Sequence, residues 1–252
     1  MLGSAGLLPL AGRAQQRPMI ASAKATRIKV ICPPGLQQVM QELSSQFRQE
    51  TGHTPAITYV LSHPAKKRIA AGETFDLAIL LSAVSDEIAN EGKIVLATAI
   101  EVMRAGMGVA VREGMPKPNI DRVQTFKRAL LDAESITYTR EAATGRYFEG
   151  LMERLELGDE VKKKVVLAMP ATSAKLVAAG KAAMAITLIA EILAAPGAEL
   201  VGPFPAELQY YIAFKAGVAS RAEQREAAGE FIKFLTGPAA ARTIRNLGVE
   251  PG

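Results

Sequence analysis

Residues 27–81 read RIKVICPPGLQQVMQELSSQFRQETGHTPAITYVLSHPAKKRIAAGETFDLAILL, and the order of patterns in this stretch decides the fold class. β-rich runs alternate with stretches whose apolar residues recur every three or four positions, which is the pattern of amphipathic helices. The run at 75–81 is almost continuously apolar, as expected for a strand of a parallel sheet covered on both faces. The stretch therefore predicts an α/β fold with mostly parallel sheets.

Two turns of this stretch are the first candidates for a binding site. They lie at 32–36 and 62–66, where a predicted strand gives way to a predicted helix. In parallel sheets ligands collect at such points, because helix N-termini offer backbone N–H groups and the positive end of the helix dipole. The candidate ligand-binding residues in these turns are Gly35, Ser62 and His63.

The alternation of strands and helices continues to the end of the chain. Further strands are predicted at 106–111, 135–138, 165–167, 184–187 and 208–214. Further helices are predicted at 123–130, from 145 onward, and at 173–179, 223–235 and 238–246. So many strands exceed the needs of one domain of ~100–150 residues, and two lobes with a ligand cleft between them are expected. Two more turns, at 139–146 and 171–174, precede predicted helices, and they add the candidates Arg140, Thr144, Arg146, Thr172 and Ser173.

Composition excludes several classes of function. With a net charge of +5, no Trp and no basic block interleaved with aromatic residues, the chain is not expected to bind nucleic acid. Cys32 is the single cysteine, which rules out an internal disulfide or a cysteine-based metal cluster. The two histidines lack metal-ligand spacing, and His53 is expected to be exposed in a turn. We find no nucleotide-binding or nucleophile-elbow motif either, so no metal and no cofactor is predicted.

Residues 1–26 are predicted to be a signal-like segment and linker. An apolar stretch at 2–11 precedes small residues that flank a plausible cleavage point after Ala14. No other apolar run reaches the ~18 residues needed to cross a bilayer. Export to the periplasm is therefore expected, with an ordinary N-terminal tail as the alternative.

Several short segments, in this order and spacing, resemble the type II periplasmic solute-binding proteins, and within them the molybdate-binding branch. The segments are SQF (45–47), ETG (50–52), IAAG (69–72), FDL (75–77), GRYF (145–148), FIKFLTGPAA (231–240) and LGV (247–249). The resemblance spans about 27–251 and implies two α/β lobes, joined by crossing strands, that close on a ligand and deliver it to an ABC permease. It implies lobe boundaries at 27–104 plus 213–252 and at 105–212. We expect a monomer.

Departures from the pattern of the molybdate branch predict a ligand other than molybdate. The molybdate branch looks to hold its oxyanion with serine hydroxyls and backbone N–H groups of the first two turns and with a later tyrosine. Here Gly35 stands where a serine is expected, two prolines before it lack N–H groups, and Leu188 follows Thr187 where the tyrosine is expected. Arg140 and Arg146 supply positive charge instead, and guanidinium groups grip carboxylates in bidentate fashion. An organic di- or tricarboxylate is therefore predicted, with molybdate or a similar oxyanion as an alternative.

Other basic and hydroxyl side chains have simpler interpretations. Lys66 and Lys67 are expected to form a solvated helix face, while Arg68 could equally contact the ligand or lie on the surface. Thr144 and Ser173 are each expected to cap a helix, a role compatible with ligand contact. Asp76, at the start of a buried strand, is expected to accept structural hydrogen bonds.

An enzyme on the same scaffold is a second hypothesis, because aconitate isomerase is similar to this family. Moving a proton along a tricarboxylate needs an acid–base group beside cationic side chains. His63, Glu141 or Tyr147 could supply that group. A DNA-binding regulator with this effector fold is disfavoured, since no helix-turn-helix segment precedes Arg27.

Overall fold

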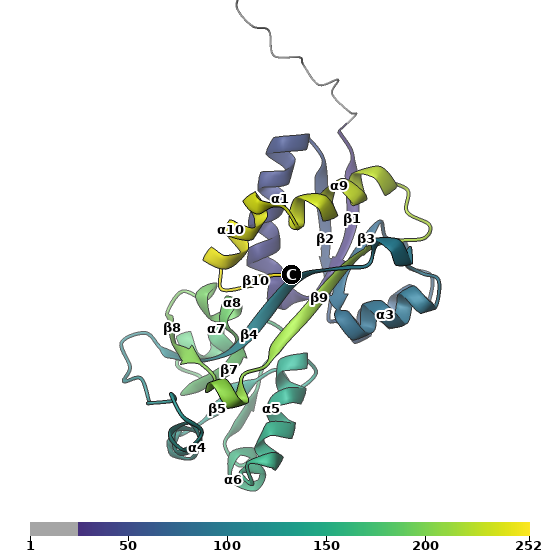
Figure 1. The fold of residues 1–252 in the computed structure, drawn as a ribbon. Helices are drawn as coiled ribbons and strands as arrows, with labels where there is room; N and C mark the ends of the chain where they lie inside the picture. Colours follow the sequence, from purple (N-terminus) through teal and green to yellow (C-terminus); the bar gives the residue numbers. More distant parts are fainter. Residues whose placement is uncertain (1–24) are drawn as a thin grey trace, which may run out of the picture.

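The computed structural model describes residues 25–252, which form two lobes joined by two long strands (Figure 1). The predicted signal-like segment lies, except for residues 25 and 26, outside the described residues. No helix of the described part is both long and apolar enough to span a membrane.

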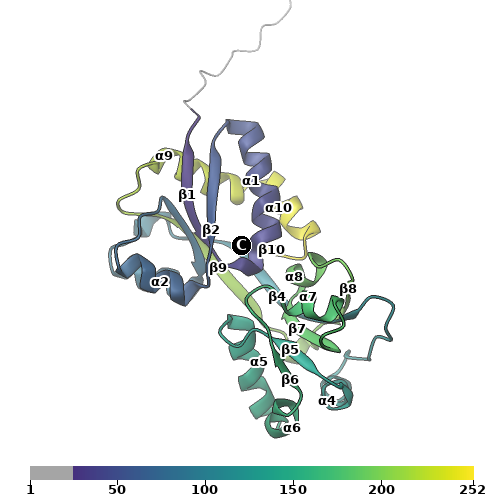
Figure 2. The same ribbon diagram turned by 180° about the vertical axis from the view of Figure 1, so that it is seen from behind.

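The first lobe contains the βαβ pattern predicted from residues 27–81. Its strands are β1 (Arg27–Cys32), β2 (Thr54–Tyr59) and β3 (Leu77–Leu81), and β1 pairs in parallel with both others. Its helices are α1 (Gln37–Thr51), α2 (Ser62–Ala70), α3 (Ser82–Asn90), α9 (Arg225–Leu235) and α10 (Pro238–Asn246). Figure 2 shows α1 and α2 beside β1 and β2.

The second lobe repeats the parallel arrangement. Its strands β5 (Ile136–Tyr138), β6 (Val165–Leu167) and β7 (Met184–Leu188) are parallel, with β5 in the middle. The helices are α4 (Val123–Asp132), α5 (Ala143–Arg154), α6 (Gly158–Lys162), α7 (Ser173–Ala178) and α8 (Ile189–Leu193). A further strand, β8 (Ala198–Pro203), was not predicted.

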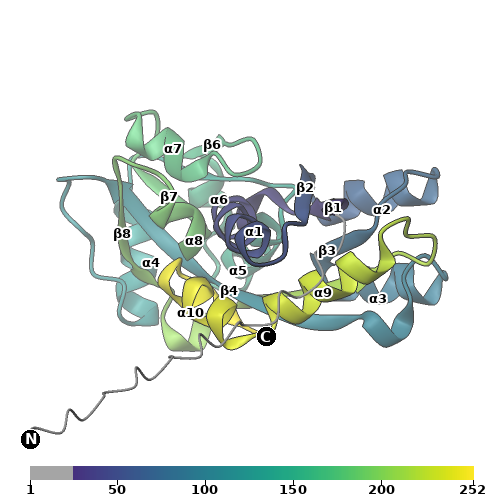
Figure 3. The same ribbon diagram turned by 90° about the horizontal axis from the view of Figure 1, so that it is seen from above.

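Two crossing strands connect the lobes and make one continuous sheet. β4 (Ile100–Arg112) and β9 (Tyr211–Val218) pair antiparallel with each other, β9 also pairs with β3, and β4 also pairs with β7 and β8. The short β10 (Glu250–Pro251) pairs with β4 as well. In the view from above, β4 extends from the side of β8 to the side of α3 (Figure 3). Parallel pairing is therefore confined to the body of each lobe, and the connections add antiparallel pairs to the predicted pattern.

The short helix α8 packs closely on β4 because β4 carries glycine there. A Cβ on Gly108 would lie 2.8 Å from Ile189 Cγ1 and 3.1 Å from Ile192 Cδ1. Since real Cβ atoms do not approach other atoms so closely, a larger residue would push α8 away from the crossing strand. Gly108 thus fixes the position of α8, which carries a residue of the candidate site.

Polar residues of the first lobe have structural roles. Asp76 is buried, and its carboxylate accepts hydrogen bonds from the backbone N–H groups of Lys29 (2.8 Å) and Gln224 (2.9 Å), as expected. His53, expected to be exposed, is only 5% exposed. Its ring lies 6.2 Å from that of Phe47 and accepts a hydrogen bond from the Thr26 N–H, so the prediction was wrong. A turn at a sheet edge can be covered by a neighbouring helix, which its local sequence does not reveal.

Candidate functional site

A small hollow of about 40 Å³ lies between the lobes, and five of the eight predicted site residues line it. These are Gly35, Ser62, His63, Thr144 and Arg146. A water molecule needs ~10–15 Å³ of such space, so the hollow has room for about three waters. The lobes must therefore separate further before an organic ligand can enter.

The second turn brings Ser62 and His63 to the hollow. Ser62 begins α2 and is buried, and its Oγ accepts a hydrogen bond from the Leu81 N–H (3.0 Å). A hydroxyl that accepts through oxygen keeps its own proton free to donate. Ser62 can therefore donate to a ligand without losing its structural bond.

The second lobe contributes Thr144 and Arg146 from the first turns of α5. Arg146 is exposed, and its Nη1 donates to the Glu141 backbone oxygen (2.8 Å), which holds the guanidinium near the start of the helix. Gly145 allows this turn, because a Cβ there would overlap the Thr139 carbonyl oxygen. Thr144 does not cap the helix as expected: the N-cap is Ala142, without a side-chain cap.

The other three predicted residues do not line the hollow. Arg140 is exposed and pairs with Glu149 (Nε to Oε1, 2.8 Å). Thr172 donates to the Met169 backbone oxygen (2.7 Å). Ser173 is fully buried but does not cap α7, and within residues 25–252 its Oγ has no hydrogen-bond partner.

The Arg140–Glu149 pair belongs to a structural cluster. The Tyr138 hydroxyl also donates to Glu149 Oε1 (2.8 Å). Burial, followed by this bond to Glu149, raises the pKa of Tyr138 to about 12. Arg140 is therefore held by Glu149 of α5 and, unlike Arg146, does not line the hollow.

A residue that the sequence did not single out, Glu191 of α8, also lines the hollow. Thr187 Oγ1 donates to Glu191 Oε2, while Oε1 faces Gly35 of the other lobe. Burial raises the pKa of Glu191, and the Thr187 hydroxyl and the charge of Lys175 only partly oppose that rise. Glu191 lies in a five-residue helix without any motif, so no sequence signal could have identified it.

Glu191 explains the glycine in the first turn. A Cβ on Gly35 would lie 2.6 Å from Glu191 Oε1 and 2.9 Å from Leu188 Cδ1. Any side chain at position 35, including the serine implied by the resemblance, would compete with Glu191 for the same space.

The basic residues after the second turn lie on the surface and do not line the hollow, as predicted for Lys66 and Lys67. Lys66 Nζ forms ion pairs with Glu87 of α3 (2.8 Å) and with Glu91, the residue that follows α3 (2.9 Å). Arg68 pairs with Glu73 (2.5 Å). These cations are therefore neutralised by carboxylates of their own lobe.

Of the suggested acid–base groups, His63 and Glu141 line the hollow, whereas Tyr147 is otherwise engaged. The Tyr147 hydroxyl donates to the Leu208 backbone oxygen (2.7 Å), and its ring stacks on Tyr210 with centroids 4.5 Å apart.

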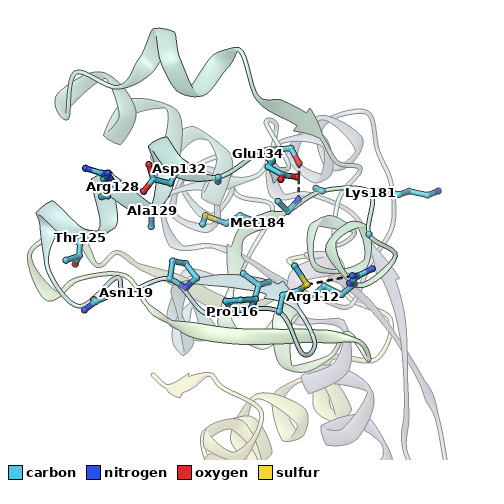
Figure 4. Close-up of a pocket in the computed structure, with 18 residues that line it drawn as sticks. Arg112, Pro116, Asn119, Thr125, Arg128, Ala129, Asp132, Glu134, Lys181 and Met184 are labelled. Carbon is cyan, nitrogen blue, oxygen red and sulfur yellow. Dashed lines mark hydrogen bonds and ion pairs between the residues drawn. The ribbon is translucent and has the colours of Figure 1, made fainter.

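A wider hollow of about 680 Å³ lies elsewhere, near the amino ends of β5 and β7 (Figure 4). Its lining mixes both signs of charge, including Arg112, Lys181 and the ion pair of Arg128 with Asp132 (2.9 Å). It contains no predicted site residue and lies within the second lobe. Ligands of α/β folds bind at the opposite, carboxyl ends of strands, so the hollow between the lobes is the better candidate.

The described residues contain no cluster of three or more metal-ligating side chains. Cys32 is buried, which raises the pKa of its thiol and favours the unreactive protonated form.

The chain is similar to known proteins over nearly all of its described length. Residues 28–250 match the family described as bacterial extracellular solute-binding protein. Aconitate isomerase from Pseudomonas sp is 24% identical over 240 residues, which cover 93% of this chain and 91% of that protein.

Solved structures share the fold at low identity. The periplasmic molybdate-binding protein of Azotobacter vinelandii superposes with a TM-score of 0.75 at 20% identity, covering 88% of this chain and 98% of that one. The substrate-binding domain of a putative molybdenum ABC transporter from Clostridium difficile gives 0.71 at 15% identity, covering 90% and 99%. The sulfate-binding protein of Mycobacterium tuberculosis gives 0.70 at 16% identity, covering 90% and 87%. At these identities the likeness shows the two-lobe fold alone.

Proposed function

Because the chain belongs to the bacterial extracellular solute-binding protein family, we propose that it binds a small anion outside the cytoplasm and delivers it to the permease of an ABC importer. The ligand is a small organic carboxylate, held between the two lobes of a periplasmic monomer. Lobe 1 comprises residues 27–104 and 213–252, and lobe 2 comprises residues 105–212.

The proposal of a carboxylate ligand rests on Arg146, which lies on the wall of the hollow between the lobes. Its Nη1 donates to the Glu141 carbonyl, which leaves other N–H groups of the guanidinium available. A guanidinium matches the two oxygens of a carboxylate with two parallel hydrogen bonds. Ser62 and Thr144 add hydroxyl donors from opposite lobes, so a ligand would draw the lobes together.

The first turn argues against a tetrahedral oxyanion. Such an ion needs many short, convergent donors, yet Pro33 and Pro34 lack N–H groups and Gly35 lacks a hydroxyl. These features favour a ligand that makes fewer and more widely spaced contacts.

A thermal-shift series tests the proposal. The purified protein is heated with citrate, trans-aconitate, tartrate, molybdate, tungstate or sulfate. A ligand at ~100 times its Kd stabilises the folded state by about 2.7 kcal/mol, which raises Tm by roughly 5–10 °C for a chain of this size. A carboxylate is expected to produce this shift. Stabilisation by molybdate or tungstate alone would overturn the carboxylate assignment.

An isomerase on the same scaffold is a second candidate, favoured by the similarity to aconitate isomerase over nearly the whole chain. His63 and Glu141 line the hollow, and Glu191 adds a third titratable group. Such groups beside Arg146 could move a proton on a bound tricarboxylate. Tyr147 is disfavoured because its hydroxyl is engaged by Leu208.

Incubation with cis- and trans-aconitate separates the two candidates. Interconversion that is lost in Arg146→Ala supports the isomerase. Saturable binding without interconversion supports the carrier.

A further inference from the structure

We propose that Glu191 acts in the ligand site as a neutral carboxylic acid that donates a hydrogen bond to the bound anion, so that anion binding takes up a proton. The inference rests on the anion-binding function proposed above. It accounts for an apparent contradiction, since a hollow suited to an anion has a carboxyl group on its wall.

The two oxygens of Glu191 have different surroundings. Oε2 accepts a hydrogen bond from Thr187, a residue of its own lobe. Oε1 faces Gly35 across the gap between the lobes, and no side chain or backbone group of residues 25–252 donates to it. An ionised carboxylate can only accept hydrogen bonds, whereas the protonated group has one O–H donor. The proton is therefore expected on Oε1, where the O–H group could donate a hydrogen bond to a ligand.

This proton would replace a donor that the first turn lacks. Pro33 and Pro34 have no N–H groups, and Gly35 has no hydroxyl. Glu191 Oε1 lies 2.6 Å from the point where a Cβ of residue 35 would be. The acid thus reaches, from the opposite lobe, the region where a serine at position 35 would present its hydroxyl.

The charges around Glu191 are few. Glu191 also lines a second hollow, where the other charged side chain is Lys175 of α7 and α1 contributes the amides of Gln37, Gln38 and Gln41. Across the hollow lie the titratable or charged groups Arg146, His63 and Glu141. Burial raises the pKa of Glu191 more than Lys175 and the Thr187 hydroxyl lower it, which favours the protonated form. An arriving anion opposes ionisation of Glu191 further, because like charges disfavour each other.

Coupling between proton and anion is reciprocal. If the anion binds the protonated form, its affinity falls as pH rises above the pKa of Glu191 in the free protein. For one linked proton, the limiting slope is about tenfold in Kd per pH unit. Glu191→Gln keeps the shape and a donor but cannot ionise, so the part of the pH dependence due to Glu191 should vanish.

The experiment is isothermal titration calorimetry with citrate, and with trans-aconitate as a second probe. Titrations at pH 6, 7, 8 and 9 in two buffers of different ionisation enthalpy give both Kd and the number of protons taken up. The wild-type protein is compared with Glu191→Gln, because the difference cancels titration of the ligand and of other groups. Glu149→Gln is the matched control, since Glu149 pairs with Arg140 outside the hollow.

We expect the wild-type protein to take up more protons than Glu191→Gln, by up to one per ligand, and to lose affinity more steeply with rising pH. Glu149→Gln should behave like the wild-type protein. Equal proton uptake and parallel pH profiles in wild type and Glu191→Gln would overturn the inference while leaving anion binding intact. If neither probe bound the wild-type protein and the wider anion series also failed, the proposed function itself would be wrong.

Discussion

Gly35 of the first lobe and Glu191 of the second share one small volume, since a Cβ on Gly35 would lie 2.6 Å from Glu191 Oε1. The two residues are therefore coupled. Gly35→Ala should displace the Glu191 side chain and weaken citrate binding by ~10–100-fold, the usual effect of losing one hydrogen bond to a charged group. In a Glu191→Ala background, Gly35→Ala should weaken citrate binding little further.

A double-mutant cycle of citrate binding, measured by calorimetry, checks this coupling. Residues in contact usually show an interaction energy of about 0.5–3 kcal/mol. Gly150→Ala serves as the control, because a Cβ there meets nothing within 4 Å. Strictly additive losses would contradict a shared volume.

The stability of the protein should also report the proton on Glu191. Burial raises its folded-state pKa above the unfolded value, so the folded state binds more protons between those two pKa values. Stability is therefore expected to fall as pH rises through that window, by about 1.4 kcal/mol for each unit of pKa difference. Glu191→Gln should lack this fall, which urea denaturation from pH 4 to pH 9 would measure. A constant difference in stability between the two proteins would refute the assignment.

Two arginines near the same turn should differ in function. Arg146 lines the hollow, whereas Arg140 pairs with Glu149. Arg146→Ala is expected to raise the Kd for citrate about tenfold or more, since a charge-assisted hydrogen bond is lost. Arg140→Ala should change it less than about twofold, as for a surface ion pair remote from the ligand. Equal effects in calorimetry would show that the hollow is not where the ligand binds.

Alanine substitutions at Gly145 and Gly150, both in α5, should change the stability of the fold in opposite directions. A Cβ on Gly145 would overlap the Thr139 backbone oxygen, so Gly145→Ala should destabilise the fold by about 3 kcal/mol or more. Gly150 lies in open space in the same helix, and Gly150→Ala should stabilise it by roughly 0.5–1 kcal/mol. Urea titrations of both variants test this pair, and similar midpoints would contradict the packing described here.

The sequence predicted the body of each lobe better than the connections. Strand β3 was recognisable because its residues are buried on both faces and so form a continuous apolar run. The extent of β4 was underestimated, since predicted strand 106–111 covers only part of Ile100–Arg112. The missed β8 is only partly buried and lacks a clear apolar pattern.

The candidate site was predictable where it follows from topology. Gly35, Ser62 and Thr144 lie at strand-to-helix turns, which parallel sheets bring together. Glu191 was not predictable, because its importance comes from contact with the opposite lobe. Arg140 was predicted to bind the ligand but pairs with Glu149 instead. Glu149 lies about two turns along α5, and no local sequence pattern indicated this pair.

The pairing of β3 with β9 has a consequence for the order of events during synthesis. Leu81 pairs with Phe214, which leaves the ribosome only after every residue of the strands β4 to β8. Until then the edge of β3 has no neighbour on that side, and exposed strand edges invite wrong pairings. The nascent chain therefore holds an incomplete apolar sheet while residues 82–214 are synthesised, which is when a holding chaperone would have the most to protect.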